Sequence, residues 1–143
     1  MKTRLNFPRS VWLLAFASFF NDIASDMLIP FVPAFLATMG AGALWLGALE
    51  GGADSVSAWL RVLSGKHSDT SGQRKPLVLL GYAVSVAARP LYALAGTPLV
   101  TVMLRAVDRV GKGVRTAPRD ALLAAHLPPE RLGEGFGFHR AFD

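Results

Sequence analysis

Long apolar stretches alternate with short polar segments along the whole chain. Four stretches, at residues 11–37, 44–63, 76–95 and 99–123, are long enough to cross a membrane as helices, since a span needs roughly 20 mostly apolar residues. A fifth apolar segment begins at about residue 135 and has nine residues up to Asp143. The pattern predicts an all-α membrane protein, a bundle of four transmembrane helices plus the start of a fifth.

The first stretch admits two other interpretations. Three basic residues precede an apolar run at 11–20, as in a secretory signal peptide. No small-residue cleavage pattern follows Phe20, however, and further spans come after it, so we expect a membrane helix. A helix that begins at Met27 and runs past Gly42 is a poorer alternative, because two prolines and two glycines interrupt it.

Charged residues interrupt these stretches at helical spacing. At about 100° per residue, the polar positions of the second stretch fall on one narrow stripe, and those of the fourth fall in less than half of the helix circumference. The stripe of the second stretch consists of Glu50, Asp54, Ser57 and Arg61. The polar face of the fourth stretch consists of Arg105, Asp108, Arg109, Lys112, Arg115, Arg119 and Asp120. In the first stretch Asn21, Asp22 and Asp26 form a wider polar arc, and Arg89 is the charge of the third.

Charges inside a membrane cost roughly 2.5 to 3.5 kcal/mol each on insertion scales, so they face other helices or water. The stripes therefore predict that these helices surround a polar transport cavity. We assign to cavity lining or proton coupling Asp22, Asp26, Glu50, Asp54, Arg105, Asp108, Arg109 and Lys112. Structural ion pairing is the alternative for each acid. An amphipathic helix on the cytoplasmic membrane surface is the alternative for residues 99–123.

The basic residues lie mainly at one side of the predicted spans. The formal net charge of +5 alone is compatible with nucleic-acid binding. The bases, however, gather before the first span, between the second and third, and after the fourth, whereas residues 38–43 and 96–98 carry none. This positive-inside pattern predicts no nucleic-acid partner and a multi-pass protein of the plasma membrane with a cytoplasmic N-terminus.

Candidate chemistry for an enzyme is sparse. The absence of cysteine excludes disulfides and thiolate metal sites. His67, His126 and His139 lack metal-ligand spacing, and the Gly-x-Gly at 111–113 lacks the strand and turn of a dinucleotide site. We therefore expect no catalytic site, no metal and no cofactor. The residues His139, Arg140 and Asp143 are expected to begin the polar face of the fifth helix.

Two motifs carry a family resemblance. The charged, glycine-punctuated run at 65–75 is predicted to be a cytoplasmic loop, with Gly65, Asp69, Gly72, Arg74 and Lys75 at its marked positions. It resembles the signature loop between the second and third helices of major facilitator superfamily transporters. The run from Arg105 to Gly113 resembles the Arg and Gly-x-Gly pattern of that family's fourth helix. Departures from the family pattern are Thr70 and Gln73, at often basic positions, and Arg109, where a glycine is common.

The resemblance implies a bacterial secondary-active permease for a small solute, with two six-helix halves built from inverted repeats. Residues 1–143 then form an incomplete N-terminal half, truncated in its fifth helix and needing the missing C-terminal helices. The loop implies a cytoplasmic gating element, for which Asp120 is the expected partner of Arg74 or Lys75. The Arg at position 105 implies proton coupling, and analogy favours efflux.

A second function stays open at this point. A non-transporting four-helix membrane scaffold or assembly subunit would bury the same polar stripes in an oligomeric interface. The substrate is open as well, because the cationic fourth helix suits an anion, whereas Asp22, Glu50 and Asp54 suit a cation or a proton.

Overall fold

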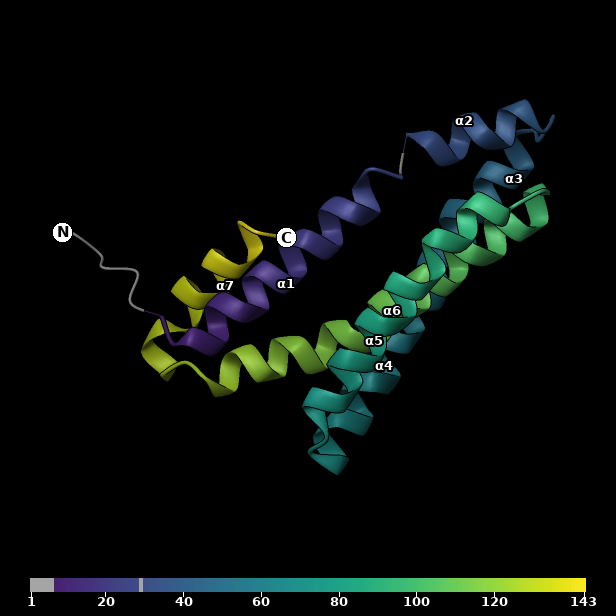
Figure 1. The fold of residues 1–143 in the computed structure, drawn as a ribbon. Coiled ribbons are helices and arrows are strands. Elements are labelled where there is room, and N and C mark those ends of the chain that lie inside the picture. The colour runs from purple at the N-terminus through teal and green to yellow at the C-terminus, as the bar shows by residue number, and fades with distance from the viewer. Residues whose placement is uncertain (1–6, 29) are drawn as a thin grey trace.

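The computed structural model describes residues 7–28 and 30–143, which form helices and short turns without a strand among them (Figure 1). The helices are α1 (Arg9–Asp26), α2 (Phe31–Thr38), α3 (Ala43–Gly47), α4 (Ala53–Ser71), α5 (Arg74–Ala88), α6 (Pro98–Ala125) and α7 (Leu132–Arg140). A π-helical turn, η1 (Ala48–Gly52), joins α3 to α4. Two 3-10 turns, η2 (Pro90–Leu94) and η3 (Pro129–Arg131), precede α6 and α7. The all-helical class expected from the sequence is confirmed.

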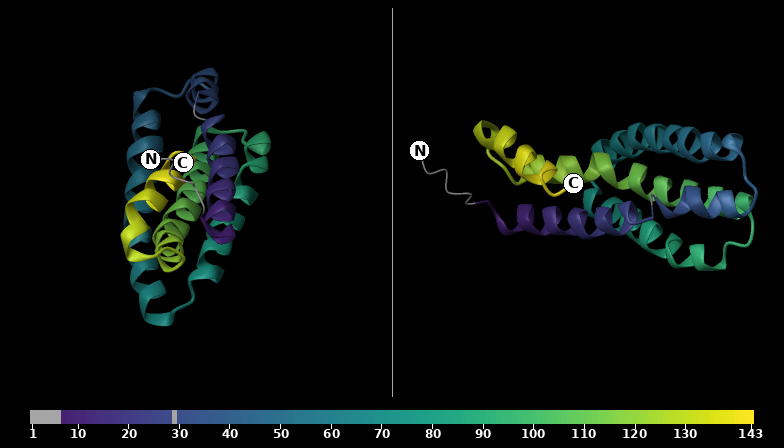
Figure 2. Two further views of the ribbon diagram at one scale, coloured as in Figure 1. Left: turned by 90° about the vertical axis from the view of Figure 1, so that its left-hand side faces the viewer. Right: turned by 90° about the horizontal axis from the view of Figure 1, so that it is seen from above.

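Helix α6 contacts most of the other helices. Its N-terminal half lies between α4 and α5, while α1 and α7 lie side by side near its C-terminal end (Figures 1 and 2). Thr97 caps its start, since its hydroxyl accepts a hydrogen bond from the Val100 amide, and Pro98 occupies the first turn, where no amide donor is needed. Figure 1 shows α6 bending between its two halves, and Pro118, which lacks an amide hydrogen, lies inside the helix.

Small residues let α4 and α5 approach α6 closely. A Cβ atom added to Gly111 would lie 2.6 Å from the carbonyl oxygen of Gly81 in α5, and one added to Gly113 would lie 2.7 Å from that of Ser57 in α4. Such distances exclude any larger side chain without displacement of backbone. Close contact between small residues is typical of helices that associate within membranes.

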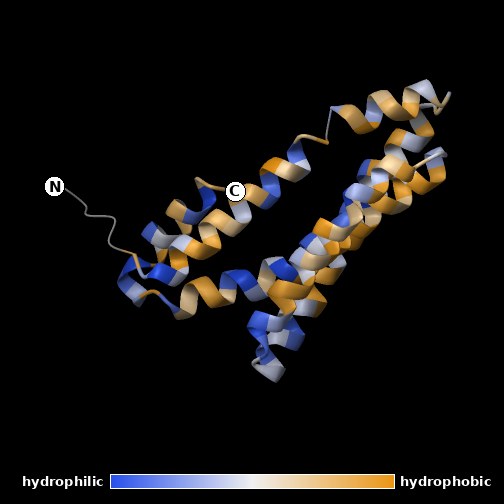
Figure 3. Cartoon of the chain, in the orientation of Figure 1, coloured by the Kyte–Doolittle hydropathy of each residue, from blue (hydrophilic) through white to orange (hydrophobic). Residues whose placement is uncertain are grey.

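The polarity of the described residues is inverted relative to a water-soluble protein. Their buried set contains 12 hydrophobic residues and 14 polar or charged ones, whereas large apolar side chains such as Phe20, Trp59 and Leu79 are exposed. Figure 3 shows hydrophilic residues interrupting the hydrophobic ones along α6 and gathered where α4 ends and α5 begins. A soluble protein buries its apolar residues instead, so this distribution suits a lipid environment.

Two helical stretches are long and apolar enough to cross a membrane, Arg9–Thr38 with 30 residues and Arg74–Leu94 with 21. They correspond to the predicted spans 11–37 and 76–95. The first comprises α1 and α2 as separate helices, and α2 ends at Thr38, before Gly40 with its positive φ of 73°; the alternative helix from Met27 past Gly42 is therefore wrong. The spans at 44–63 and 99–123 are helical but heavily charged, and their crossing of a membrane stays a prediction.

The predicted loop at 65–75 is mostly helix. α4 continues to Ser71, and α5 begins at Arg74, so only Gly72 and Gln73 connect the two helices. Gly72 has the left-handed φ of 68° that glycine adopts at a helix end, and its amide donates to the Ser68 carbonyl. Gly65 is not a turn residue, because it lies within α4, where an added Cβ would be 3.2 Å from Ala117 Cβ of α6.

Candidate functional site: a charged ladder on α6

The charged face of α6 meets four different helices. Arg105, Asp108, Arg115 and Arg119 of this face are buried. Side chains of the face contact residues of α1, α4 and α5 and the residue Asp143 after α7. The sequence predicted that these charged residues of α6 lie on one side of the helix, and the structure gives them a series of ion pairs and hydrogen bonds along it, which we call the charged ladder. It consists of four groups, which we describe from the N-terminal end of α6 onward.

The first group joins α6 to the exposed acids of the second predicted span. Arg109 Nε lies 3.3 Å from Asp54 Oδ1, and its Nη2 lies 4.0 Å from Glu50 Oε2. Arg105 Nη2 lies 3.9 Å from Glu50 Oε1. Glu50 belongs to the π-helical turn η1, a distortion that often marks functional positions in helices. Both carboxylates stay more than half exposed, so water reaches this end of the ladder.

The second group centres on Asp108. Its Oδ2 accepts a hydrogen bond from the Ser25 hydroxyl at 3.3 Å, and its Oδ1 lies 3.5 Å from Arg89 Nη2 of the predicted third span. Arg89 also donates to Asn21 Oδ1 at 2.8 Å. This group therefore ties α1, the end of α5 and α6 together through one buried carboxylate. Arg89, the charged residue of the predicted third span, is thus ion-paired within the chain.

The third group centres on Asp22 of α1. Arg115 Nη2 donates to Asp22 Oδ1 at 3.0 Å, and Lys112 Nζ lies 3.6 Å from the same oxygen. The guanidinium of Arg115 also lies 4.4 Å from the centroid of the Tyr82 ring, a cation–π contact. The Arg115 side chain is 1% exposed, so this pair is shielded from water.

The fourth group surrounds Arg119. Its Nη1 and Nη2 donate to Asp143 Oδ1 and Oδ2 at 2.8 and 3.1 Å, a two-pronged pair between α6 and the chain after α7. Nη1 also donates to the Ser18 hydroxyl at 2.9 Å, and Ser18 lies 3.3 Å from His139 Nε2. Nothing in the sequence pointed to Ser18 or to Tyr82, whose hydroxyl lies 3.0 Å from that of Ser18.

Residues assigned to the gating loop are not assembled as predicted. Asp120 lies 3.3 Å from the neighbouring Arg119, and Arg74 Nη1 donates to the Ala121 carbonyl at 3.4 Å instead of to the Asp120 carboxylate. The expected pair of Asp120 with Arg74 or Lys75 is therefore corrected to a contact between Arg74 and the α6 backbone. In the described part of the chain Asp69 and Lys75 are exposed and have no ion pair.

Asp26 stands apart from the other cavity candidates. It lies at the C-terminal end of α1, is exposed, and has no ion pair within residues 7–28 and 30–143. It lines a shallow cavity of about 200 Å³ that Asp22 and Asp143 also border. Its place near the ladder is thus shown, but it does not take part in the pairing.

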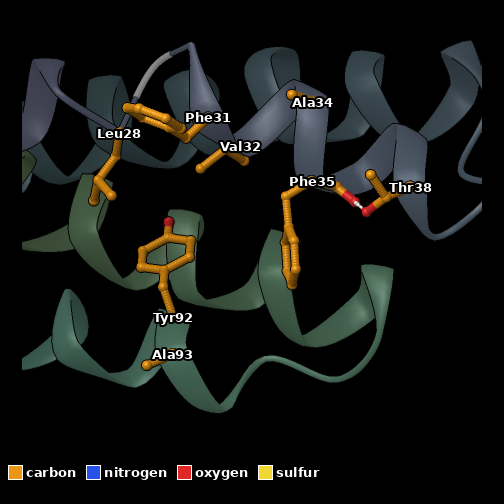
Figure 4. Close-up of a pocket in the computed structure, with 8 residues that line it drawn as sticks. All are labelled: Leu28, Phe31, Val32, Ala34, Phe35, Thr38, Tyr92 and Ala93. Atoms are coloured by element: carbon orange, nitrogen blue, oxygen red, sulfur yellow. Dashed lines mark hydrogen bonds between the residues drawn. The ribbon is translucent and has the colours of Figure 1, made fainter.

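A separate apolar pocket of about 470 Å³ lies between α2 and η2 (Figure 4). Its lining is almost wholly hydrocarbon, and the Tyr92 side chain extends from η2 toward Leu28 and Val32. No member of the charged ladder lines it. Across the described residues, no group of three or more histidine, aspartate or glutamate side chains is placed to hold a metal ion.

Comparison with known proteins identifies the family. The sequence model of the Major Facilitator Superfamily matches residues 14–143. An uncharacterized MFS-type transporter of Methanocaldococcus jannaschii is 42% identical over 135 residues, covering 94% of this chain and 34% of that protein. The multi-drug resistance efflux pump PmrA of Streptococcus pneumoniae is 26% identical over 141 residues, covering 94% of this chain and 34% of that protein.

An uncharacterized protein of Mycobacterium tuberculosis is 34% identical over 108 residues, or 76% of this chain and 26% of its own length. The chain thus spans about a third of the length of these relatives or less. No solved structure matches it significantly. The family match extends over nearly all of the described residues. This chain belongs to the Major Facilitator Superfamily, a family of membrane-embedded, multi-pass proteins.

Proposed function

We propose that residues 1–143 form part of the N-terminal half of a secondary-active, proton-coupled permease that exports a small solute. In this proposal α1 with α2, α3 with α4, α5 with η2, and α6 supply four transmembrane spans, and α7 begins the fifth. The N-terminus and the α4–α5 connection lie in the cytoplasm of a cell whose plasma membrane holds the protein. Further helices complete the cavity.

The observation that carries this proposal is the buried contact of Asp22 with Arg115 and Lys112 between α1 and α6. A carboxylate paired with two cations holds the helices together while it is ionised. Protonation removes its charge and leaves the two cations uncompensated, which is costly in a water-poor interior. Uptake of one proton is therefore expected to loosen α1 from α6, a way to couple proton entry to a change of conformation.

The other acids extend this pathway. Glu50 and Asp54 are open to water and contact Arg105 and Arg109, whereas Asp108 is buried farther along the same face. We propose that protons enter at the exposed acids and reach the buried ones, with Asp26 at the mouth near Asp22. The likeness to PmrA, whose name records efflux of drugs, supports the export direction.

We further propose that the α4–α5 corner controls cytoplasmic access. Gly72 allows the sharp reversal, Gly65 allows α4 to lie against α6, and Arg74 holds the corner to the Ala121 carbonyl. Asp69 and Lys75 have no ion pair among the described residues and are available to other parts of the transporter, whereas Asp120 would first leave Arg119.

Proton-coupled transport is tested in vesicles prepared from cells that produce the intact protein carrying this chain. An imposed pH gradient is expected to drive solute movement in the wild type, and Asp22→Asn is expected to abolish the dependence on the gradient. Glu130→Gln is the matched control, because Glu130 is exposed and lies outside the ladder. Gradient-driven transport that survives Asp22→Asn unchanged would contradict the role of Asp22.

A further inference from the structure

A cavity on the charged side of α6 has a cationic lining of which the proton pathway uses only Lys112. It has a volume of about 220 Å³ and lies where α4, α6 and α7 meet. Its lining consists of Arg61, Lys112, Thr116, Arg119, Asp120, Phe136, His139, Arg140 and Asp143. Four of these side chains are always cationic and two are acidic, so with a neutral histidine the cavity has a surplus of two positive charges.

Two of the cations have no ion-pair partner among the described residues. Lys112 lies 3.6 Å from Asp22, which also pairs with Arg115, and Arg119 pairs with Asp143 and Asp120. Arg61 of α4 and Arg140 of α7 line the same cavity, yet neither makes an ion pair within the described part of the chain. The surplus is thus contributed by guanidinium groups that are open to a ligand.

The Arg119 guanidinium already shows how an oxyanion is held there. Its two terminal nitrogens donate to both oxygens of the Asp143 carboxylate. Nη1 also donates to the Ser18 hydroxyl, which lies 3.3 Å from His139 Nε2. Arginine forks bind carboxylate and phosphate oxygens in this way, and several forks around one cavity favour a multiply charged anion. The volume is below the range of roughly 300 to 1,000 Å³ that drug-sized ligands occupy, so the anion is small.

We infer that this cavity binds a small, doubly charged oxyanion of the phosphate or dicarboxylate class and that, resting on the proposed transport function, this is the class of solute carried. Arg61 and Arg140 contact the ligand directly. The Asp143 carboxylate acts as a resident counter-ion that keeps Arg119 oriented until the ligand arrives. The polar stripe of α4, which ends in Arg61, thereby gains a role that ion pairing within the chain does not explain.

The inference is tested by calorimetric titration of inorganic phosphate and of succinate into the intact protein, held in phosphatidylcholine nanodiscs at constant ionic strength. Saturable binding of at least one dianion is expected. Arg61→Gln and Arg140→Gln are each expected to weaken it at least tenfold, the size of one lost hydrogen bond to a charged group. Both residues are exposed, so these changes leave the fold intact.

Arg9→Gln is the matched control, because Arg9 is exposed and lies outside the cavity. No saturable binding, or an equal loss in the Arg9 variant, overturns the inference. A second arm uses phosphatidylglycerol nanodiscs. If these abolish dianion binding, a lipid headgroup occupies the cavity, which supports an anion site but overturns its assignment to the solute.

Failure here is distinguishable from failure of the proposed function. Proton-driven transport of a neutral or cationic solute without dianion binding retains the function and rejects the inference. Dianion binding without any proton-driven transport retains the site and rejects proton coupling.

Discussion

At the scale of single residues, the buried carboxylates are the most consequential groups on the ladder. Asp108 is 6% exposed at its side chain and lies against Arg89, which is itself only 13% exposed. Removal of one member of such a buried pair leaves the other charge without compensation. The cost of that change is typically about 3 to 5 kcal/mol.

Asp108→Leu is therefore expected to lower the free energy of unfolding by about 3 to 5 kcal/mol. Asp69→Leu, at an exposed position without an ion pair among the described residues, is expected to change it by less than about 0.5 kcal/mol. Denaturant titration in detergent micelles measures both variants. Equal effects of the two substitutions would show that Asp108 does not depend on its pairing.

Glycines at the helix contacts give a second prediction at this scale. A Cβ at Gly111 would lie 2.5 Å from Ser85 Oγ and 2.6 Å from the Gly81 carbonyl oxygen. Gly111→Ala is expected to push α5 and α6 apart at a cost of about 1 to 3 kcal/mol, the usual range for overpacking. A fall in melting temperature measures it.

Gly137→Ala is the control for that variant, since nothing lies within 4 Å of the added Cβ in α7. Alanine favours a helix more than glycine does, so this change is expected to be neutral or stabilising. A lower melting temperature for the control would attribute the Gly111 effect to something other than crowding.

The sequence predicted correctly which charged residues share one face of a helix, because that placement depends only on the helical period. Arg105, Asp108, Lys112 and Arg115 were expected to share a face of one helix, and they do. The contacts of Ser18 and Tyr82 were not predicted, because the partners of a hydroxyl group depend on which residues lie next to it in the folded structure. The pairing of Asp120 was mispredicted because opposite charge on the same side of a membrane does not specify which neighbour is nearest.

At the scale of elements, the α4–α5 connection differs most from expectation. Its glycines and charges are typical of a loop, yet residues 65–71 continue the helix because Gly65 faces α6 and the charged residues around it face outward. The polar composition of residues 65–71 indicates that most of their side chains are exposed, and exposed residues occur in both loops and helices. Only Gly72, with its positive φ, marks the end of the helix unambiguously.

The bend of α6 gives a prediction at this scale. Pro118→Ala restores the missing amide donor and is expected to straighten the helix, so that its ends move apart toward the roughly 1.5 Å per residue of a straight helix. The chain contains no cysteine, so spin labels are introduced only at Leu99→Cys and Ala125→Cys. Pulsed electron resonance is expected to report a longer distance in the proline variant than in the parent. An unchanged distance would assign the bend to packing of α1 and α7 instead.

At the scale of the whole molecule, two features describe the orientation of the chain in the bilayer. These are the exposed apolar side chains and the side of the membrane on which each connection between helices lies. Trp59 and Leu79 are 72% and 69% exposed. Cysteine introduced at either position is expected to resist water-soluble thiol reagents because lipid covers it. Cysteine at Gln73 is expected to react only after the cells are permeabilised, and cysteine at Gly96 in intact cells, as the positive-inside pattern requires.

Reaction of the Gln73 variant in intact cells would reverse the proposed topology. Rapid reaction at positions 59 and 79 would place those faces in water or in an aqueous cavity. Both outcomes are read from the same labelling series, with the cysteine-free parent as the blank.

The glycine contacts between α5 and α6 have one more consequence. Two helices whose backbones touch at Gly81 and Gly111 leave no gap into which an acyl chain can intercalate. Helices α5 and α6 are thus expected to tilt together in bilayers of different thickness or unsaturation. The hydrophobic mismatch between helices and bilayer is then expected to strain the polar contacts of α1 with α6. In the proposed transporter, membrane composition is then expected to change the transport rate through the contacts of α1.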